Sequence, residues 1–172
     1  EVMDGIVAYT YGSDGRVASK SVDEDGPDGV WDSITTYAYD SHGNLLNQSE
    51  DDDGDGTVEV VLSYTNDYDD DGNLVEVWQS INGNPVDHLS YTYDDADRRT
   101  SATYYDQDGV CISFRTYTYT DAGLLETETD GPCEEGVFDS VHHYRYDPMG
   151  NLMFVFMEHT PGGESVIAFG YG

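Results

Sequence analysis

The chain has 172 residues, of which 36 are acidic and only 6 are lysine or arginine, so its formal net charge is −30 at neutral pH. Nucleic acids and anionic membrane surfaces are bound through basic patches, and this charge argues against both as partners. No run of about 18 apolar residues is present, so we also expect no membrane insertion. Self-repulsion of this size is relieved by salt or by bound cations.

One short phrase returns along the whole chain: two aromatic residues separated by one residue, then a turn and Gly-Asn-Leu. The clearest copies are residues 37–45 and 144–152, and 68–74 is a looser copy. The second aromatic residue marks the copies in steps of 25 to 29 residues, at Tyr11, Tyr39, Tyr68, Tyr93, Tyr119, Tyr146 and Tyr171. A period in this range is typical of a repeat architecture.

The spacing predicts a single repeat array over residues 1–172, with a truncated repeat at each end. Its six expected units are residues 9–36, 37–65, 66–90, 91–116, 117–143 and 144–168. Alternation places both rings of each Tyr-x-Tyr on one face of a strand, and no window has helical periodicity. We therefore predict an all-β fold of tandem antiparallel β-hairpins that form an elongated or spiralling β-strip, like a solenoid or a shell wall.

A tight turn follows each Tyr-x-Tyr strand. Residues 147–150, Asp-Pro-Met-Gly, suit a type I turn, because Asp caps the backbone, Pro fixes its own φ and Gly accepts a left-handed conformation. Residues 40–43 and 69–72 keep the Asp and the Gly. Residues 120–123 have Thr in place of the Asp, and residues 94–97 have Asp in place of the Gly.

The second connection of each unit is longer and acidic in four copies. These copies are residues 23–29, 51–56, 106–109 and 130–136, while 82–85 and 160–163 have turn residues without the charge. Alternating aspartates on a glycine-bent backbone supply the oxygens that Ca²⁺ needs, and Asp51, Asp53 and Asp55 resemble the first half of an EF-hand loop. The position for the last EF-hand ligand holds Leu62 instead of Glu.

These connections and the strands that follow them give a set of candidate Ca²⁺ ligands. The set is Asp23, Asp25, Asp28, Asp32, Asp51, Asp53, Asp55, Glu59, Asp106, Asp108, Asp130 and Asp139. The alternative is a row of solvated acidic turns in a salt-adapted protein, which the similarly acidic tight turns favour. Both interpretations stay open.

Two further residue types suggest structural roles. Cys111 and Cys133 are the only cysteines and fall in adjacent units, so they form a disulfide if the chain is secreted or are two free buried thiols. The periodic tyrosines favour a cross-strand ladder over a sugar-binding surface. The predicted ladder is Tyr11, Tyr39, Tyr68, Tyr93, Tyr119 and Tyr146. No sequence motif for a nucleophile, a hydrolytic metal or a phosphate is present, so we expect no enzyme.

The phrase Tyr-x-Tyr-Asp-x-x-Gly-Asn-Leu resembles the YD repeat of the Rhs, Tc-toxin C-component and teneurin families, over essentially the whole chain. The resemblance implies antiparallel β-strips that spiral into a hollow shell in secreted or surface-exposed proteins, some of which enclose a toxin domain. The period here is longer than the usual YD unit because of the acidic connections. The core at which Rhs proteins cleave themselves is absent from this sequence.

We therefore expect a structural, non-catalytic β-repeat scaffold of an extracellular or cell-surface bacterial protein. Its expected partners are further repeats of the same chain or other copies of itself, because unpaired strand edges template more pairing, up to a filament. One alternative is a wall segment of a toxin-enclosing shell. The other is a glycan-binding adhesin module, for which the periodic tyrosines give no support.

Overall fold

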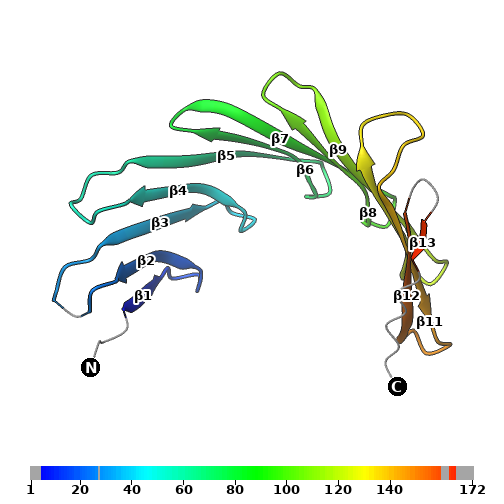
Figure 1. The fold of residues 1–172 in the computed structure, drawn as a ribbon, viewed down its shortest axis with the longest axis horizontal. Helices are drawn as coiled ribbons and strands as arrows, with labels where there is room; N and C mark the ends of the chain where they lie inside the picture. Colours follow the sequence, from blue (N-terminus) through cyan, green and yellow to red (C-terminus); the bar gives the residue numbers. More distant parts are fainter. Residues whose placement is uncertain (1–4, 27, 160–162, 166–172) are drawn as a thin grey trace. The chain divides into compact units, whose positions relative to one another are not determined.

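The computed structural model describes residues 5–26, 28–159 and 163–165, and within them the chain is all-β, as predicted. Each strand is hydrogen-bonded to the strands next to it in the sequence, and the pairs are antiparallel (Figure 1). The strands in the described part are β1 (Ile6–Tyr11), β2 (Val17–Asp23), β3 (Ser33–Tyr39), β4 (Leu45–Asp51), β5 (Val60–Tyr68), β6 (Leu74–Ile81), β7 (Asn84–Tyr93), β8 (Arg99–Asp106), β9 (Cys111–Tyr119), β10 (Leu125–Pro132), β11 (Ser140–Tyr146), β12 (Leu152–His159) and β13 (Gly163–Ser165).

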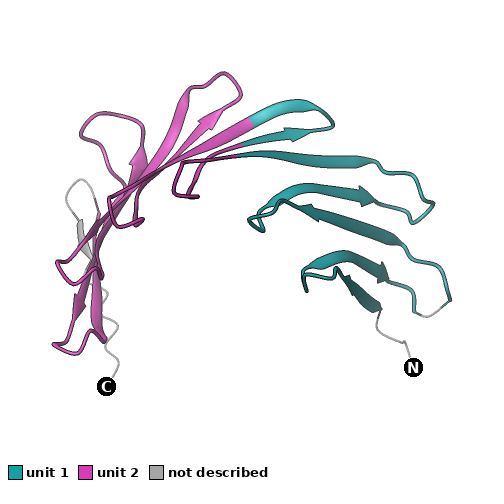
Figure 2. Cartoon of the chain, turned by 180° about the vertical axis from the view of Figure 1, so that it is seen from behind, with its two compact units in different colours: residues 1–66, 78–86 teal, residues 67–77, 87–172 magenta. Residues whose placement is uncertain are grey.

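The chain divides into two compact units, coloured separately in Figure 2. Unit 1 comprises residues 1–66 and 78–86, and unit 2 comprises residues 67–77 and 87–172. Within each unit, hairpins follow one another in chain order, so every strand has a partner that is close in the sequence.

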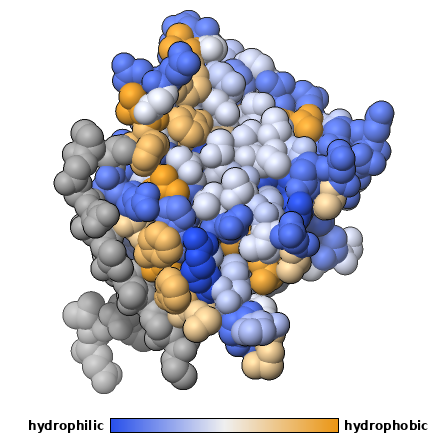
Figure 3. All heavy atoms as spheres, turned by 90° about the vertical axis from the view of Figure 1, so that its right-hand side faces the viewer, coloured by the Kyte–Doolittle hydropathy of each residue, from blue (hydrophilic) through white to orange (hydrophobic). Residues whose placement is uncertain are grey.

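The sheet has no buried apolar core within the described residues. From β3 on, the rings of the Tyr-x-Tyr pairs are half-buried and the residue between them is exposed, as with Thr92 between Tyr91 and Tyr93. The rings of Tyr9 and Tyr11 in β1 are exposed. Polar and apolar side chains are intermixed on the face that Figure 3 displays. Backbone ladders and cross-strand side-chain pairs therefore supply most of what holds the hairpins together.

Seven connections in the described part share one five-residue turn. The N–H of the first residue donates to the carbonyl of the fifth over 2.8–3.0 Å, and the N–H of the fourth donates to the carbonyl of the first over 2.8–3.1 Å. The turns are residues 12–16, 40–44, 69–73, 94–98, 106–110, 120–124 and 147–151. The fourth residue has a positive φ, which explains the glycine there, and Asp97 takes it with φ 58°.

The first residue of the turn explains the aspartate of the repeated phrase. The Asp147 Oδ1 atom accepts the N–H groups of Met149 (2.8 Å) and Asn151 (2.9 Å). Asp40, Asp69, Asp94 and Asp106 accept the corresponding pairs of amides. The side chain of Asn151 and then its backbone amide hold the pKa of Asp147 below its usual value, because both stabilise the carboxylate.

Two connections differ from the sequence-based prediction. Residues 106–109, predicted as a long acidic connection, form the same tight turn, because Asp106 and Gly109 have the spacing of Asp147 and Gly150. Between β6 and β7 the chain reverses in the two residues Asn82 and Gly83, with φ 50° and 78°, as in a type I′ hairpin. Residues 160–162 of the last predicted connection, and the copy at Tyr171, lie outside the described residues.

Candidate metal centre

Three long connections are closed by the same kind of backbone hydrogen bond, and together they contain most of the predicted Ca²⁺ ligands. They lie between β2 and β3, between β4 and β5, and between β10 and β11. In each, the residue before the next strand donates its N–H to a backbone carbonyl near the end of the preceding strand. The three bonds are Asp32 to Val22 (2.8 Å), Glu59 to Glu50 (2.9 Å) and Asp139 to Asp130 (2.8 Å). Asp23, Asp51 and Gly131 therefore occupy equivalent positions, and all three are buried.

The connection at residues 51–59 orients three carboxylates with its own amides. The Oδ2 atom of Asp51, a residue that is 6% exposed, accepts the N–H of Gly56 over 2.8 Å. The Oε2 atom of Glu59 accepts the N–H of Asp52 over 2.8 Å, and the Oδ1 atom of Asp53 accepts the N–H of Asp55 over 3.2 Å. The loop backbone thus fixes the direction of each acid.

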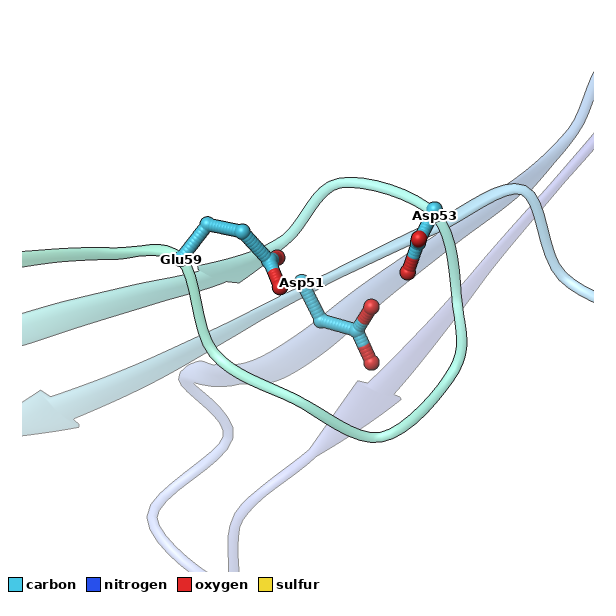
Figure 4. Close-up of side chains that lie close together, drawn as sticks. All are labelled: Asp51, Asp53 and Glu59. Atoms are coloured by element: carbon cyan, nitrogen blue, oxygen red, sulfur yellow. The ribbon is translucent and has the colours of Figure 1, made fainter.

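These three side chains meet inside the loop, as Figure 4 shows. One carboxylate oxygen from each of Asp51, Asp53 and Glu59 lies within 4.8 Å of the other two. The second oxygen of Asp51, Oδ1, is buried and has no hydrogen-bond partner. The group is therefore a candidate metal site made only of oxygen ligands.

In the first long connection the predicted ligands bind the loop backbone. The Asp32 Oδ2 atom accepts the N–H of Glu24 over 2.6 Å, as Glu59 does with Asp52, and the Asp28 Oδ1 atom accepts the N–H of Val30 over 2.8 Å. Asp23 is buried at the end of β2, and Asp25 is exposed in the loop. Within the described residues, this connection does not bring three acids together as residues 51–59 do.

The other predicted ligands are also placed apart from the cluster. Asp55 faces its own loop, where the side chain and amide of Thr57 lower its pKa. Asp106 caps a tight turn that includes Asp108. Asp130 accepts the hydroxyl of Ser140 over 2.7 Å, and Asp139 closes the third connection through its backbone.

The third long connection carries a disulfide where the second carries carboxylates. Cys133, in this connection, is bonded to Cys111 at the start of β9, with their Cα atoms 5.7 Å apart. Gly131 takes the position of the buried aspartate, and a β-carbon there would lie 2.7 Å from the Cα atom of Phe138. A buried acid would not fit at this place.

Three of the marker tyrosines link their hairpin to the one before it. Their hydroxyls donate to the first residue of the return strand in the preceding hairpin: Tyr93 to Leu74 (2.9 Å), Tyr119 to Arg99 (2.7 Å) and Tyr146 to Leu125 (2.9 Å). The guanidinium groups of Arg16 and Arg98 lie over the rings of Tyr39 and Tyr119, at 5.7 and 4.6 Å. Sequence reasoning missed the hydroxyl bonds and the arginines.

The comparison with protein families bears on the turn-rich stretch at the middle of the chain. Residues 68–109 match the family model described as RHS Repeat. The resemblance to the YD-repeat families, inferred from the repeated phrase, is thereby confirmed. No curated protein matches the chain.

Two solved structures have a fold similar to that of this chain. One is the crystal structure of TcdB2-TccC3, with 18% identity, a TM-score of 0.55 and coverage of 89% of this chain and 8% of that chain. The other is a Tc holotoxin pore from Photorhabdus luminescens, with 18% identity, a TM-score of 0.56 and coverage of 92% and 8%. This chain thus spans about a twelfth of the chains that it resembles. Among the described residues, no helix has the length and apolar character needed to cross a membrane.

Proposed function

We propose that this chain is a structural, non-catalytic β-strip, forming part of the wall of an Rhs- or Tc-like shell in a secreted or surface-exposed bacterial protein. Its acidic connections are stabilised by cations. The observation that carries the proposal is the strand order: hairpins paired one after another in chain order, with the fold of part of the Tc complexes.

The way in which hairpins are joined supports a scaffold role. The described residues include no buried apolar side chain, and successive hairpins are joined by ladders and by tyrosine hydroxyls that reach back to the preceding hairpin. Such joints repeat with the sequence, so a strip can be lengthened unit by unit. Partners are accordingly further repeats of the same chain or other copies of it, paired along strand edges.

Electron microscopy of the full-length gene product tests the shell. The expected result is a hollow particle whose wall contains this strip. A compact particle without an interior would overturn the proposal. Analytical ultracentrifugation of the 172-residue chain over a hundredfold concentration range tests filament formation. Oligomers that grow with concentration are expected if copies of the chain pair along their strand edges. A constant molecular mass is expected if the strip pairs only with further repeats of its own chain.

A hollow in unit 2 is the observation that favours glycan binding as a second candidate. It has a volume of about 360 Å³ and includes Tyr91, Tyr117, Arg99 and Arg115 in its lining. Aromatic faces can pack on sugars, and guanidinium groups donate to hydroxyls or carboxylates. A glycan array with Tyr117→Ala as the control tests this function, and an array without hits would remove it.

A further inference from the structure

We propose that Asp51, Asp53 and Glu59 form a calcium site that holds the connection 52–58 in place over the preceding connection. The proposed function includes stabilisation of the acidic connections by cations, and this inference assigns that role to one site and one ion. The site does not depend on whether the strip belongs to a shell.

The buried oxygen of Asp51 is the first reason. Asp51 is 6% exposed, and its Oδ1 atom has no hydrogen-bond partner. Among the described residues, none of the ion pairs with a basic side chain includes Asp51, Asp53 or Glu59. A buried carboxylate oxygen without a partner is costly, and two further carboxylates beside it raise the cost. A cation at this place removes both penalties.

The geometry suits calcium. Two oxygens that share one Ca²⁺ at about 2.4 Å can be at most about 4.8 Å apart. One oxygen from each of the three acids lies within this limit of the other two, and the acids point into the space that the loop encloses (Figure 4). Carboxylate oxygens are the ligands that hard cations prefer, and water completes a coordination number of six to eight.

The ion would act on the contact between two successive connections. Gly54, next to the ligand Asp53, packs against the backbone carbonyl of Trp31 in the connection 24–32. A cation that fixes Asp53 therefore also fixes this contact. In the third long connection a disulfide ties down the equivalent loop, so the cluster does with an ion what Cys111 and Cys133 do with a covalent bond.

Isothermal titration calorimetry with CaCl₂, on the whole chain stripped with chelator, tests the site. We expect one ion per chain, with a dissociation constant of about 10⁻⁴ to 10⁻³ M, the range of extracellular calcium modules. Asp53→Asn and Glu59→Gln should each weaken binding at least tenfold. Asp52→Asn removes the same charge from an exposed residue of the same loop and should change affinity less than twofold.

Thermal unfolding of Asp51→Asn distinguishes a ligand from a merely structural acid. Without calcium the variant should unfold at the same temperature as the wild type or higher, because it lacks a buried charge. With calcium the order should reverse, since the midpoint of the wild type rises with concentration and that of the variant does not. A variant that is less stable by the same amount in both buffers would overturn the site.

Two other results would also reject the proposal. One is a rise in the wild-type midpoint that NaCl reproduces at equal ionic strength, which is screening alone. The other is binding of Mg²⁺ as tight as that of Ca²⁺, which would show that the site does not favour calcium. Neither result affects the shell proposal, which is tested by imaging.

Discussion

Gly54 packs against the backbone carbonyl of Trp31 so closely that no β-carbon fits between them. The contact joins two successive long connections of unit 1. Gly54 also has a positive φ of 67°, so two separate constraints meet at one residue. Gly56, two residues on, has a φ of 92° but open space around its Cα atom.

This pair of glycines gives a prediction with an internal control. Gly56→Ala should cost about 1 kcal/mol, the price of a left-handed alanine. Gly54→Ala carries the same backbone cost and must also push the two connections apart, so we expect a loss of roughly 2–4 kcal/mol. Urea unfolding of both variants measures the difference. Equal losses would mean that the Trp31 contact contributes nothing.

The hydroxyls of Tyr93, Tyr119 and Tyr146 each donate to the preceding hairpin. Replacing any one of them with phenylalanine should lower the free energy of unfolding by about 1 kcal/mol, the usual net value of such a bond. The effects should add in double variants, because the three bonds share no partner. Tyr11→Phe is the control, since this residue is 63% exposed, and it should be neutral within about 0.5 kcal/mol.

The disulfide between Cys111 and Cys133 closes a loop with a sequence separation of 22. Loop-closure entropy predicts that the double variant Cys111→Ser, Cys133→Ser is less stable by about 3 kcal/mol. Reducing agent should lower the unfolding midpoint of the wild type and leave that of the double variant unchanged. Detection of two free thiols in unfolded, unreduced protein would refute the bond.

Tyr144 makes the stability depend on pH in the alkaline range. Burial, followed by the nearby Glu128 carboxylate, raises its pKa from 10.0 to about 12. The folded state therefore favours the protonated hydroxyl, and this contribution is complete below pH 10 and is lost as the pH rises from 10 to 12. The stability difference between the wild type and Tyr144→Phe should shrink over that interval. A difference that is constant from pH 8 to 12 would contradict the assignment.

The sequence was sufficient for the fold class and for most turns. The rule that an aspartate or threonine begins the turn, with glycine three residues later, predicted residues 147–150 and 120–123, and it also allowed Asp97 to replace glycine. The same rule could have identified residues 106–109 as a tight turn. The aspartate content of these residues suggested a long acidic connection, although Asp106 and Gly109 have the spacing of a tight turn.

The candidate site was less accessible to sequence reasoning. Asp51, Asp53 and Glu59 were among twelve predicted ligands, but the alternating pattern also pointed to Asp55, which binds its own loop backbone. Glu59 reaches the other two acids because its backbone N–H donates to the carbonyl of Glu50 and so closes the connection. Burial of Asp51, and its unpartnered oxygen, are properties of the packed loop, so no pattern of residue types reveals them.

The strand order has a consequence for how the chain folds. Each strand pairs with its neighbours in the sequence, so the contacts have a low contact order and each hairpin can close without waiting for a distant segment. Formation can begin at any hairpin and spread in both directions, and a strip of this kind tolerates gain or loss of whole hairpins by duplication or deletion in its gene. Forced extension from the two termini should therefore release the chain in steps of hairpin size, and not in one event.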